Sequence, residues 1–565
     1  MFLGLFARAA VWLGVALLTV AGISSAQAQS TAEPSHIDER FRPKPAQPTL
    51  GPPIEIPSTP RSVAPAGSEG IQFTLTSVSF DGNTTLPAGK LQAIVAPYIG
   101  HAITLAQAYE IADRVTAAYR DAGYILTRAV VPPQHVSSGH LTLRIVEGYI
   151  DRVQIQGNAG GATSYLEAYG QRIAAQRPLT AAVLERELLL ANDITGLNVR
   201  SVLTPSASSV GGADLTLVVD RKPVNGYAAV DNRGSKYLGP YEIMGGVFFN
   251  DVFNTAGRLG LNAVVTPDSG PDLAYGAVSY DQPIGTNGLR LFSSLSYTRT
   301  RPGAILRTLD TKGSALNGDL SLSYPIIRSR DLNLMTSVGF AYHDVRSSNF
   351  AVSPLFSDHI RALNANIFLN ALDDWGGFST LSVSVTQGLE IFGATRSGSP
   401  DKSRVGASGS YTRANFEATH DQPLFDPISL FLSASGQTSF GKPLLASEQY
   451  ALGGTNYDRA FDPSEVTGDS AIAGRAELRW DLIDRLSFLS GIQLYGFYEG
   501  GEVWQAEALP GTLDHETLYS TGAGLRFAIA DRVNADVEWA KPLHRDVAAN
   551  GNRDSRFFFT VSTNF

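Results

Sequence analysis

The sequence predicts two small α+β domains followed by a transmembrane antiparallel β-barrel of about sixteen strands. Three observations predict this fold class. The N-terminus has the pattern of a secretory signal, and the chain behind it has no cysteine and only 17% charged residues. Two segments with the same β-α-α-β-β order come next. Residues 223–565 then alternate between apolar and polar side chains, which is typical of strands with one face on lipid and one on a polar lumen.

The first 70 residues are predicted to precede the folded domains. Residues 1–28 are predicted to be a signal peptide, because Arg8 precedes an apolar run from Ala9 to Ile23 and Ala26-Gln27-Ala28 forms a small-residue cleavage site. The alternative, an anchoring transmembrane helix, is disfavoured because the run is short. Residues 29–70 contain nine prolines and are predicted to be an extended linker, in which only Ser35–Phe41 could form a short helix.

Residues 71–149 are predicted to form the first α+β unit. In chain order we expect a strand at Phe73–Phe80, a helix at about Pro87–Tyr98, a second helix from Thr104, and strands near Tyr124–Val131 and His140–Val146. Alternation of apolar residues predicts the first strand. Thr104 with a glutamine three residues later forms a capping box, which marks the start of the second helix.

Residues 150–222 are predicted to form a second unit of the same kind. The motif Val78–Asn83 recurs at Val153–Asn158, an offset of 75 residues, which indicates a repeated supersecondary unit. We expect a strand at Arg152–Gln156, helices at Tyr165–Arg172 and from Thr180, and strands at Val199–Thr204 and Asp214–Val219. Neither unit contains a recognisable catalytic motif. An open edge of either sheet could accept an extended chain as an added strand.

Residues 223–565 are predicted to form the barrel. Leu295 and Tyr297 alternate with Ser294 and Ser296, and similar alternation recurs in other segments separated by turn residues. The region has room for roughly sixteen strands with turns and longer loops. The chain stops on a strand-like Phe557–Phe565. The alternative, a soluble β-sandwich or propeller, is disfavoured by the signal peptide, the absence of cysteine and the terminal phenylalanine.

A candidate functional pair lies in the last third of this region. A loop rich in Gly, Asn and Asp, within Leu452–Trp480, contains Arg459. On the strand that follows, Glu499 lies on the opposite face from Leu494 and Tyr498. If those two residues meet lipid, Glu499 points into the lumen, where its carboxylate matches the guanidinium fork of Arg459. The alternative is that Arg459 is an ordinary solvated loop residue.

Composition and motifs argue against several classes of function. Without cysteine, the chain has no disulfide, thiolate metal site or cysteine nucleophile. The nine histidines form no recognisable ligand pattern, and the H-E-x-x-H, G-x-S-x-G and phosphate-binding-loop motifs are absent from the sequence. We therefore expect no enzyme, no cofactor and no metal. The net charge of -9 argues against nucleic acid as a partner.

Short motifs also occur in a definite order along the chain. They are Gly82-Asn83, Tyr119, Gly123-Tyr124-Ile125, Thr127-Arg128, Pro133-Gln134, Gly139 and Glu147-Gly148 in the first unit; Asn192-Asp193, Gly196 and Gly212-Ala213-Asp214-Leu215 in the second; and Asp231-Asn232-Arg233-Gly234 at the barrel entrance, Tyr324-Pro325 before Arg328-Ser329, and Leu452-Gly453-Gly454 in the barrel. With the signal peptide and the Pro-rich linker, this order resembles the TpsB transporters of two-partner secretion, the haemolysin and filamentous-haemagglutinin secretion/activation proteins. The resemblance covers nearly the whole mature chain.

The resemblance implies that the two units are POTRA domains, named POTRA 1 (residues 71–149) and POTRA 2 (residues 150–222) below. They would lie in the periplasm beneath a barrel in the Gram-negative outer membrane. The family's Val-Arg-Gly-Tyr/Phe loop tip corresponds to Asp458-Arg459-Ala460-Phe461, and its Phe-x-Asp-x-Gly wall motif to Phe497-Tyr498-Glu499-Gly500-Gly501. Asp458, Ala460 and Glu499 depart from that pattern. Glutamate lengthens the wall carboxylate's arm, and Asp458 is a second carboxylate that could compete for Arg459.

The resemblance also implies a function. The chain would recognise a large unfolded exoprotein, of the adhesin or haemolysin type, through its POTRA domains and secrete it through the barrel without ATP. Tyr119, Tyr124, Arg128 and Gln134 would dock this client. The barrel-assembly machinery would insert the chain, as a monomer in contact with outer-membrane lipid, through the last strand that ends at Phe565.

Two alternatives stay open from sequence. One is an outer-membrane protein assembly factor of the same superfamily, although such proteins usually carry more than two POTRA units. The other is a porin-like channel with periplasmic adaptors and no specific client. The family often plugs its pore with an N-terminal helix, and Ser35–Phe41 is the segment that could form one here.

Overall fold

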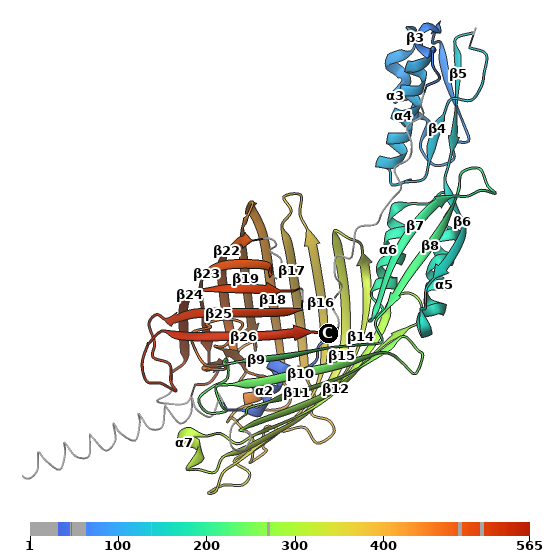
Figure 1. Cartoon of the computed structure of the whole chain (residues 1–565). Helices are drawn as coiled ribbons and strands as arrows, with labels where there is room; N and C mark the ends of the chain where they lie inside the picture. Colours follow the sequence, from blue (N-terminus) through green and yellow to red (C-terminus); the bar gives the residue numbers. More distant parts are fainter. Residues whose placement is uncertain are drawn as a thin grey trace, which may run out of the picture.

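The computed structural model describes residues 32–45, 47, 64–136, 138–267, 272–483, 489–508, 513–530 and 532–565. It shows a closed β-barrel with two α+β domains attached in tandem to one end (Figure 1). The predicted signal peptide and most of the predicted linker lie outside the described residues. Among the helices of the described ranges, none is long and apolar enough to cross a membrane.

POTRA 1 consists of a three-stranded sheet and two α-helices that pack on it. After η1 (Ser68–Gly70), its elements are β1 (Gln72–Thr74), β2 (Ser77–Asp81), α3 (Ala88–Val95), η2 (Ala96–Tyr98), β3 (Ala102–Thr104), α4 (Leu105–Asp121), β4 (Arg128–Val130) and β5 (His140–Val146). The sheet order is β2-β5-β4, and β1 pairs with β3. Thr104 and Gln107 form the expected capping box at the start of α4. Ile111 and Val115 of α4 are fully buried in the domain core.

The prediction of one strand at Phe73–Phe80 is wrong, because two short strands occupy this segment. The amide of Leu75 donates to His101 O at 3.0 Å, whereas the amide of Thr76 donates to Gly139 O at 2.8 Å. The chain therefore changes partners between these two residues. It leaves β3 and joins the sheet that contains β5.

POTRA 2 has the predicted β-α-α-β-β order. Its elements are β6 (Tyr149–Gln156), η3 (Gly160–Ala162), α5 (Thr163–Ala175), α6 (Ala181–Asn192), β7 (Leu197–Pro205) and β8 (Gly212–Arg221). The sheet order is β6-β8-β7, with β6 parallel to β8. Leu166 of α5, Leu188 of α6 and Leu215 of β8 meet in the core, so both helices bury their apolar faces against the same sheet.

Sixteen strands form the closed barrel, which confirms the predicted fold class. They are β9 (Val224–Asp231), β10 (Glu242–Val252), β11 (Gly257–Val265), β12 (Leu273–Ile284), β13 (Leu289–Thr300), β14 (Lys312–Arg328), β15 (Leu332–Ser348), β16 (Phe356–Leu372), β17 (Phe378–Gly388), β18 (Thr412–Phe425), β19 (Ile428–Thr438), β22 (Ser470–Ile483), β23 (Leu489–Trp504), β24 (His515–Ile529), β25 (Val533–Pro542) and β26 (Arg556–Asn564). Neighbouring strands pair antiparallel in chain order, and β26 pairs with β9 to close the ring. A short helix, α7 (Ala304–Arg307), lies between β13 and β14.

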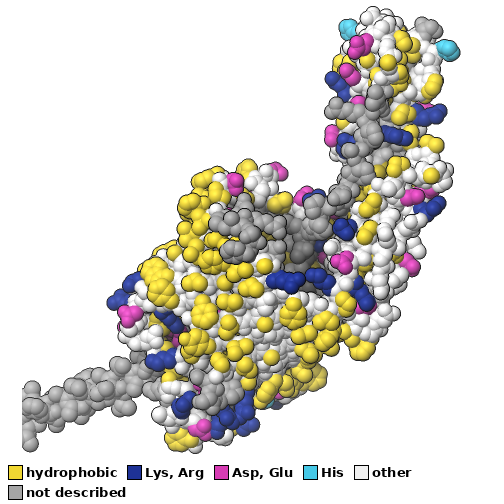
Figure 2. Space-filling view, viewed as in Figure 1, with side chains coloured by type: hydrophobic (Ala, Val, Ile, Leu, Met, Phe, Trp, Pro, Cys, Tyr) yellow, Lys and Arg dark blue, Asp and Glu magenta, His cyan; other side chains and the backbone are white. Residues whose placement is uncertain are grey.

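Alternation along the strands separates a polar lumen from an apolar outer surface. On β13, Ser294 and Ser296 are buried, whereas Leu295 and Tyr297 are 51% and 52% exposed. Figure 2 shows apolar side chains gathered over the barrel wall. Because a closed barrel satisfies its backbone polar groups between strands, this apolar surface can lie directly against lipid.

Helix α2 (Pro34–Phe41) lies inside the barrel (Figure 1). Ile37 packs in an apolar cluster with residues of the wall. Arg40 makes two hydrogen bonds to Glu242 of β10, at 3.2 and 2.9 Å, and Ser296 of β13 donates to Asp38. The segment that the sequence left as a possible short helix is therefore helical and occupies the lumen.

Charged contacts fix POTRA 2 to the adjacent end of the barrel. Arg328 at the end of β14 makes two hydrogen bonds to Asp193, which directly follows α6, at 2.9 and 2.7 Å. Arg221 at the end of β8 pairs with Asp251 of β10 at 2.6 Å. Asp193 and Arg328 both belong to the motifs of the family resemblance. In this structure the two motifs contact each other and set the position of POTRA 2 on the barrel.

We expect Asp193→Ala to loosen POTRA 2 from the barrel. The Arg328 side chain is 1% exposed, and removing the partner of a buried charge typically costs about 3–5 kcal/mol. Because the chain has no cysteine, spin labels at Arg200→Cys of POTRA 2 and Asp374→Cys of the barrel can be placed without background. Their distance distribution should broaden in Asp193→Ala.

The matched control for this measurement is Arg144→Ala in POTRA 1. Arg144 pairs with Asp81 at 3.6 Å, and both side chains are more than half exposed. Such surface pairs contribute about 0–1 kcal/mol, so this variant should leave the distribution unchanged. A distribution as narrow in Asp193→Ala as in the wild type would contradict the prediction.

Candidate functional site in the barrel lumen

The loop between β19 and β22 starts at the end of the barrel away from POTRA 2 and folds back into the lumen. It contains η4 (Ala446–Glu448) and two short paired strands, β20 (Tyr450–Leu452) and β21 (Val466–Gly468). Gly453 directly follows β20 with φ of +106°, a conformation that favours glycine, and a Cβ there would lie 2.4 Å from Asp462 O. This turn directs residues 457–465 into the lumen, where all of them are buried.

Arg459, at the tip of this loop, pairs with three glutamates from three strands. Its Nε, Nη2 and Nη1 atoms lie 3.2, 3.0 and 2.8 Å from Glu499 of β23, Glu477 of β22 and Glu538 of β25. The guanidinium also lies 3.6 Å from the centroid of the Phe497 ring. Arg459 is 5% exposed and the three glutamates are fully buried, so the alternative of a solvated loop residue is wrong.

Glu499 meets Arg459 through both carboxylate oxygens. Oε2 faces the guanidinium, whereas Oε1 accepts hydrogen bonds from the Arg459 backbone amide and from the Ser520 hydroxyl. The longer arm of glutamate therefore reaches the backbone as well as the side chain of the tip. The departure from aspartate at this wall position is compatible with pairing.

Three further arginines offset the negative charge around Arg459. They are Arg479 and Arg526, each 2.9 Å from Glu477, and Arg233, 3.1 Å from Glu538. Burying a carboxylate without a partner costs roughly several kcal/mol of desolvation free energy per ion. The tip and its strands therefore form one charge network, in which removal of any member leaves an unbalanced buried ion.

Sequence reasoning missed Glu477 and Glu538. Each alternates with an outward apolar neighbour, Leu478 at 51% and Val537 at 50% exposed, so their inward direction was readable from the pattern. The pattern does not show how far along the barrel axis each of these two glutamates lies. In the β22–β23 register the residue opposite Glu499 is Arg475, and local alternation cannot specify such pairing between strands.

The other predicted residues of the loop and wall have packing roles. Phe461 is 1% exposed and lies in one apolar cluster with Phe497. A Cβ on Gly501 would lie 2.8 Å from Leu452 Cδ2, so a side chain at this position would collide with the loop. Asp458 is fully buried, and its carboxylate has no hydrogen-bond partner among the described residues. Arg459 is thus paired with the wall glutamates and not with Asp458.

The predicted docking residues of POTRA 1 divide into two groups. Tyr119 is fully buried and donates to Asn83, and burial followed by the charge of Glu147 raises its pKa to about 12. The side-chain amide of Gln134 donates to Thr142 O at 2.8 Å and accepts from the Thr142 backbone amide at 2.7 Å. The fold itself uses both side chains, and their role in docking a client stays a prediction.

The remaining two predicted docking residues are accessible. Tyr124 is half-buried, with its ring 6.0 Å from that of Tyr119. Arg128 is exposed on β4, an edge strand of the sheet. A family motif read from sequence does not distinguish a residue that builds the domain from one that faces a partner.

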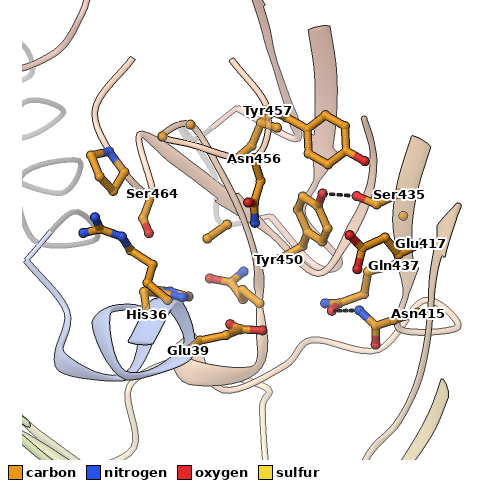
Figure 3. A pocket seen from close by; sticks show the side chains of 18 of the residues that line it. His36, Glu39, Asn415, Glu417, Ser435, Gln437, Tyr450, Asn456, Tyr457 and Ser464 are labelled. Atoms are coloured by element: carbon orange, nitrogen blue, oxygen red, sulfur yellow. Dashed lines mark hydrogen bonds between the residues drawn. The ribbon is translucent and has the colours of Figure 1, made fainter. Parts of the chain in front are cut away.

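A polar cavity of about 350 Å³ lies between α2, the loop and the inner wall (Figure 3). His36 and Glu39 of α2 border it on one side, and Asn415, Glu417 and Gln437 of β18 and β19 border it on the other. The lumen is therefore occupied partly by α2 and partly by the loop, with polar space between them.

Comparisons with known proteins agree with this architecture. The family model described as "Haemolysin secretion/activation protein ShlB/FhaC/HecB" matches residues 211–527, and that of the "POTRA domain, ShlB-type" matches residues 73–148. Heme/hemopexin transporter protein HuxB of Haemophilus influenzae (strain 86-028NP) is 23% identical over 490 residues, which cover 84% of this chain and 85% of HuxB. Outer membrane transporter CdiB of Escherichia coli is 24% identical over 481 residues, covering 83% of this chain and 78% of CdiB. The solved structure of CdiB from Escherichia coli has a TM-score of 0.70 at 21% identity and covers 96% of this chain and 98% of that one.

We expect Glu538→Gln to expose the loop tip to trypsin. The amide keeps the side-chain shape but removes one of the charges that hold Arg459 in the lumen. Opening of the tip should become on the order of tenfold more frequent, since a charge-assisted hydrogen bond is roughly twice as strong as a neutral one. Trypsin cleaves after arginine, so the yield of the fragment that ends at Arg459, quantified by mass spectrometry, reports the opening.

Asp546→Asn is the matched control for this cleavage assay. It removes a carboxylate from an exposed pair with Arg553, in which the side chains are 57% and 54% exposed. The yield of the Arg459 fragment should stay at the wild-type value. Equal yields from Glu538→Gln and the wild type would show that Glu538 does not hold the tip.

Proposed function

The chain belongs to the haemolysin secretion/activation protein ShlB/FhaC/HecB family of outer-membrane transporters, and on that premise we propose that it secretes a large unfolded exoprotein through its barrel. The POTRA domains lie in the periplasm and the barrel in the outer membrane. The observation that carries the proposal is the content of the lumen. A polar wall surrounds a short helix and a loop tip, both held mainly by hydrogen bonds and ion pairs.

We propose that the client docks at the edge of a POTRA sheet as an added strand. Backbone groups at a sheet edge provide the hydrogen bonds of such docking, and side chains beside the edge provide specificity. Arg128 fits this role because it is exposed on the edge strand β4. Tyr124 lies four residues before Arg128 and is half-buried. It is the second predicted docking residue that a client could contact.

Passage through the barrel requires α2 to leave the lumen. The helix is held by Arg40 with Glu242, by Arg42 with Asp319 at 3.8 Å, and by Ser296 with Asp38. An unfolded client has polar backbone groups throughout, and a polar lumen can satisfy them away from lipid. The network around Arg459 would keep the loop tip against the β22–β25 wall during transport.

Folding of the client outside the cell is the proposed driving force. The sequence contains no phosphate-binding-loop motif, which is in keeping with transport without ATP. The client is proposed to be a large secreted protein of the adhesin or haemolysin type. We further propose that the transporter acts as a monomer, inserted by the barrel-assembly machinery through β26 and Phe565.

Comparative proteomics of the culture supernatant and the outer membrane, with and without this chain, tests the proposed function. Loss of one large secreted protein from the supernatant is the expected result, and it identifies the client. Loss of many barrel proteins from the outer membrane would instead indicate an assembly factor. No change in either fraction would favour a porin-like channel.

We expect Arg459→Ala to reduce secretion at least about tenfold without preventing insertion. The substitution removes the cation shared by three buried glutamates, and breaking such a buried network typically costs about 3–5 kcal/mol at the tip. Secretion is measured as client in the supernatant, and insertion as folded barrel in the outer-membrane fraction. Arg553→Ala, from the exposed pair with Asp546, is the control and should secrete normally. Wild-type secretion by a well-inserted Arg459→Ala would contradict the proposed role.

A further inference from the structure

The outer surface of the barrel carries two arginines at the end away from POTRA 2. Arg299, near the end of β13, follows the outward-facing Tyr297 in the strand alternation and is exposed. Arg346, near the end of β15, is exposed between Val345 and Ser347, which are buried on the inner face. Among the residues that the structure describes, neither guanidinium has an ion-pair or hydrogen-bond partner. Two cations therefore point away from the lumen with no carboxylate to neutralise them.

Strand register places these two arginines at one level of the wall. Arg299 is opposite Ser314 of β14, and Ser314 is opposite Arg346 of β15. Neighbouring strands lie about 4.7–4.9 Å apart, so the Cα atoms of the two arginines are separated by about 9–10 Å. Ser314 between them adds a hydroxyl group and little bulk. The three residues Arg299, Ser314 and Arg346, called the basic strip below, form one polar row on the outer surface.

The basic strip lies at the outer edge of the apolar band that faces lipid. Arg290, at the other end of β13, donates to Asp193 O of POTRA 2 at 2.7 Å and so marks the periplasmic end of this strand. Arg299 follows it by nine residues. At about 3.4 Å per residue and a strand tilt of roughly 40°, this span rises about 23 Å, against about 25 Å for the apolar band of such barrels. Tyr297, just before the strip, stands where interfacial aromatic residues are expected.

Further charged residues surround the basic strip. Arg301 directly follows β13, and Lys312 is the first residue of β14; both are exposed. Figure 2 shows Lys and Arg side chains gathered at this end of the barrel, in the region where Figure 1 places α7. Two carboxylates nearby are already paired, Asp310 with Lys312 at 2.6 Å and Asp344 with Arg361 at 2.9 Å. These carboxylates therefore leave the charge of the strip unbalanced.

A phosphorylated glycolipid has the chemistry that fits this position. The outer leaflet of a Gram-negative outer membrane contains lipopolysaccharide, whose lipid A part joins acyl chains to a diphosphorylated sugar. Guanidinium forks bind phosphate oxygens in pairs, and their charge is attracted to anionic headgroups. On β14, Leu316 and Leu320 face outward on the membrane side of Ser314 and are 39% and 50% exposed. An acyl chain below a bound headgroup would contact this apolar wall, which a free anion cannot use.

We propose that the basic strip binds the phosphorylated headgroup of lipid A, with Arg299 and Arg346 as its two cations. The acyl chains lie against the apolar wall below, and the bound lipid fixes the level of β13–β15 in the outer leaflet. The site is on the outer surface of the barrel, on the other side of the wall from α2 and the polar cavity. It does not depend on the proposed secretion function.

Native mass spectrometry of the purified full-length protein in detergent micelles tests the proposal. Titrated with lipid A, the wild type should retain the diphosphoryl form more tightly than the dephosphorylated form. Each basic residue near an anionic lipid surface changes affinity about fivefold, so Arg299→Ser/Arg346→Ser should bind diphosphoryl lipid A about 25-fold more weakly. Arg299→Lys/Arg346→Lys keeps the charge but loses the planar forks, so its affinity should be intermediate. Wild-type affinity in both double variants would overturn the proposal.

Lys442→Ser/Lys541→Ser is the matched control for the loss of two charges. Lys442 follows β19 and Lys541 lies near the end of β25, so both are exposed at the same end of the barrel but away from β13–β15. This variant should keep wild-type affinity for diphosphoryl lipid A. A fall equal to that of Arg299→Ser/Arg346→Ser would show unspecific charge attraction and refute the site.

Inorganic phosphate separates a lipid site from a site for a free anion. Present in large excess, it should leave diphosphoryl lipid A bound to the wild type, because it cannot replace the contacts of the acyl chains. Complete displacement would assign the basic strip to a free anion and refute the lipid site. No client is present in these titrations, so their outcome is distinct from that of the secretion experiments.

Discussion

One guanidinium buried among three carboxylates is the interaction on which the barrel's internal arrangement depends. Arg459 needs Glu477, Glu499 and Glu538 at hydrogen-bonding distance at the same time, and these glutamates come from three different strands. Its planar fork can serve three acceptors in fixed directions, which a lysine ammonium cannot do in the same way. The loop therefore constrains the relative heights of β22, β23 and β25, and the strands in turn constrain the loop. Because each buried ion needs its partners, an intermediate position of the tip has no favourable set of contacts.

The polarity of the lumen has a second consequence, at helix α2. Strand alternation that places apolar side chains on lipid necessarily places polar ones inside, where α2 packs. The helix accordingly buries Ser35, His36 and Asp38 together with Ile37, which would be unusual for a helix in an apolar core. Each hydrogen bond to the charged groups Arg40, Glu242 and Asp38 contributes about 1.5–3 kcal/mol net, because water replaces the partner when the bond breaks. The wall therefore holds α2 chiefly through polar contacts.

The sequence predicted those parts of the structure that depend on local pattern. Period-two alternation identified the strands and the inward direction of Glu499, and the capping box identified the start of α4 at Thr104. Parts that depend on contacts between distant segments were not predictable. The break between β1 and β2 arises because Leu75 and Thr76 bond to different strands, and the roles of Glu477 and Glu538 depend on barrel register. Tyr119 illustrates a third limit, since a buried tyrosine with a hydroxyl partner and an exposed docking tyrosine look alike in one sequence.

The path of the chain after α2 indicates toward which end of the barrel this helix could leave the lumen. Gln47 lines a cavity of about 180 Å³ together with Asp193 of POTRA 2 and the glycines Gly285 and Gly288 of the β12–β13 turn. The helix is therefore tethered at the POTRA end of the barrel, through a segment whose prolines favour extended backbone. A helix on such a tether can be withdrawn toward the periplasm without crossing the loop tip. The loop enters the lumen from the opposite end, so the two occupants of the barrel have separate exits. In the proposed function, release of α2 would therefore not require Arg459 to leave its glutamates.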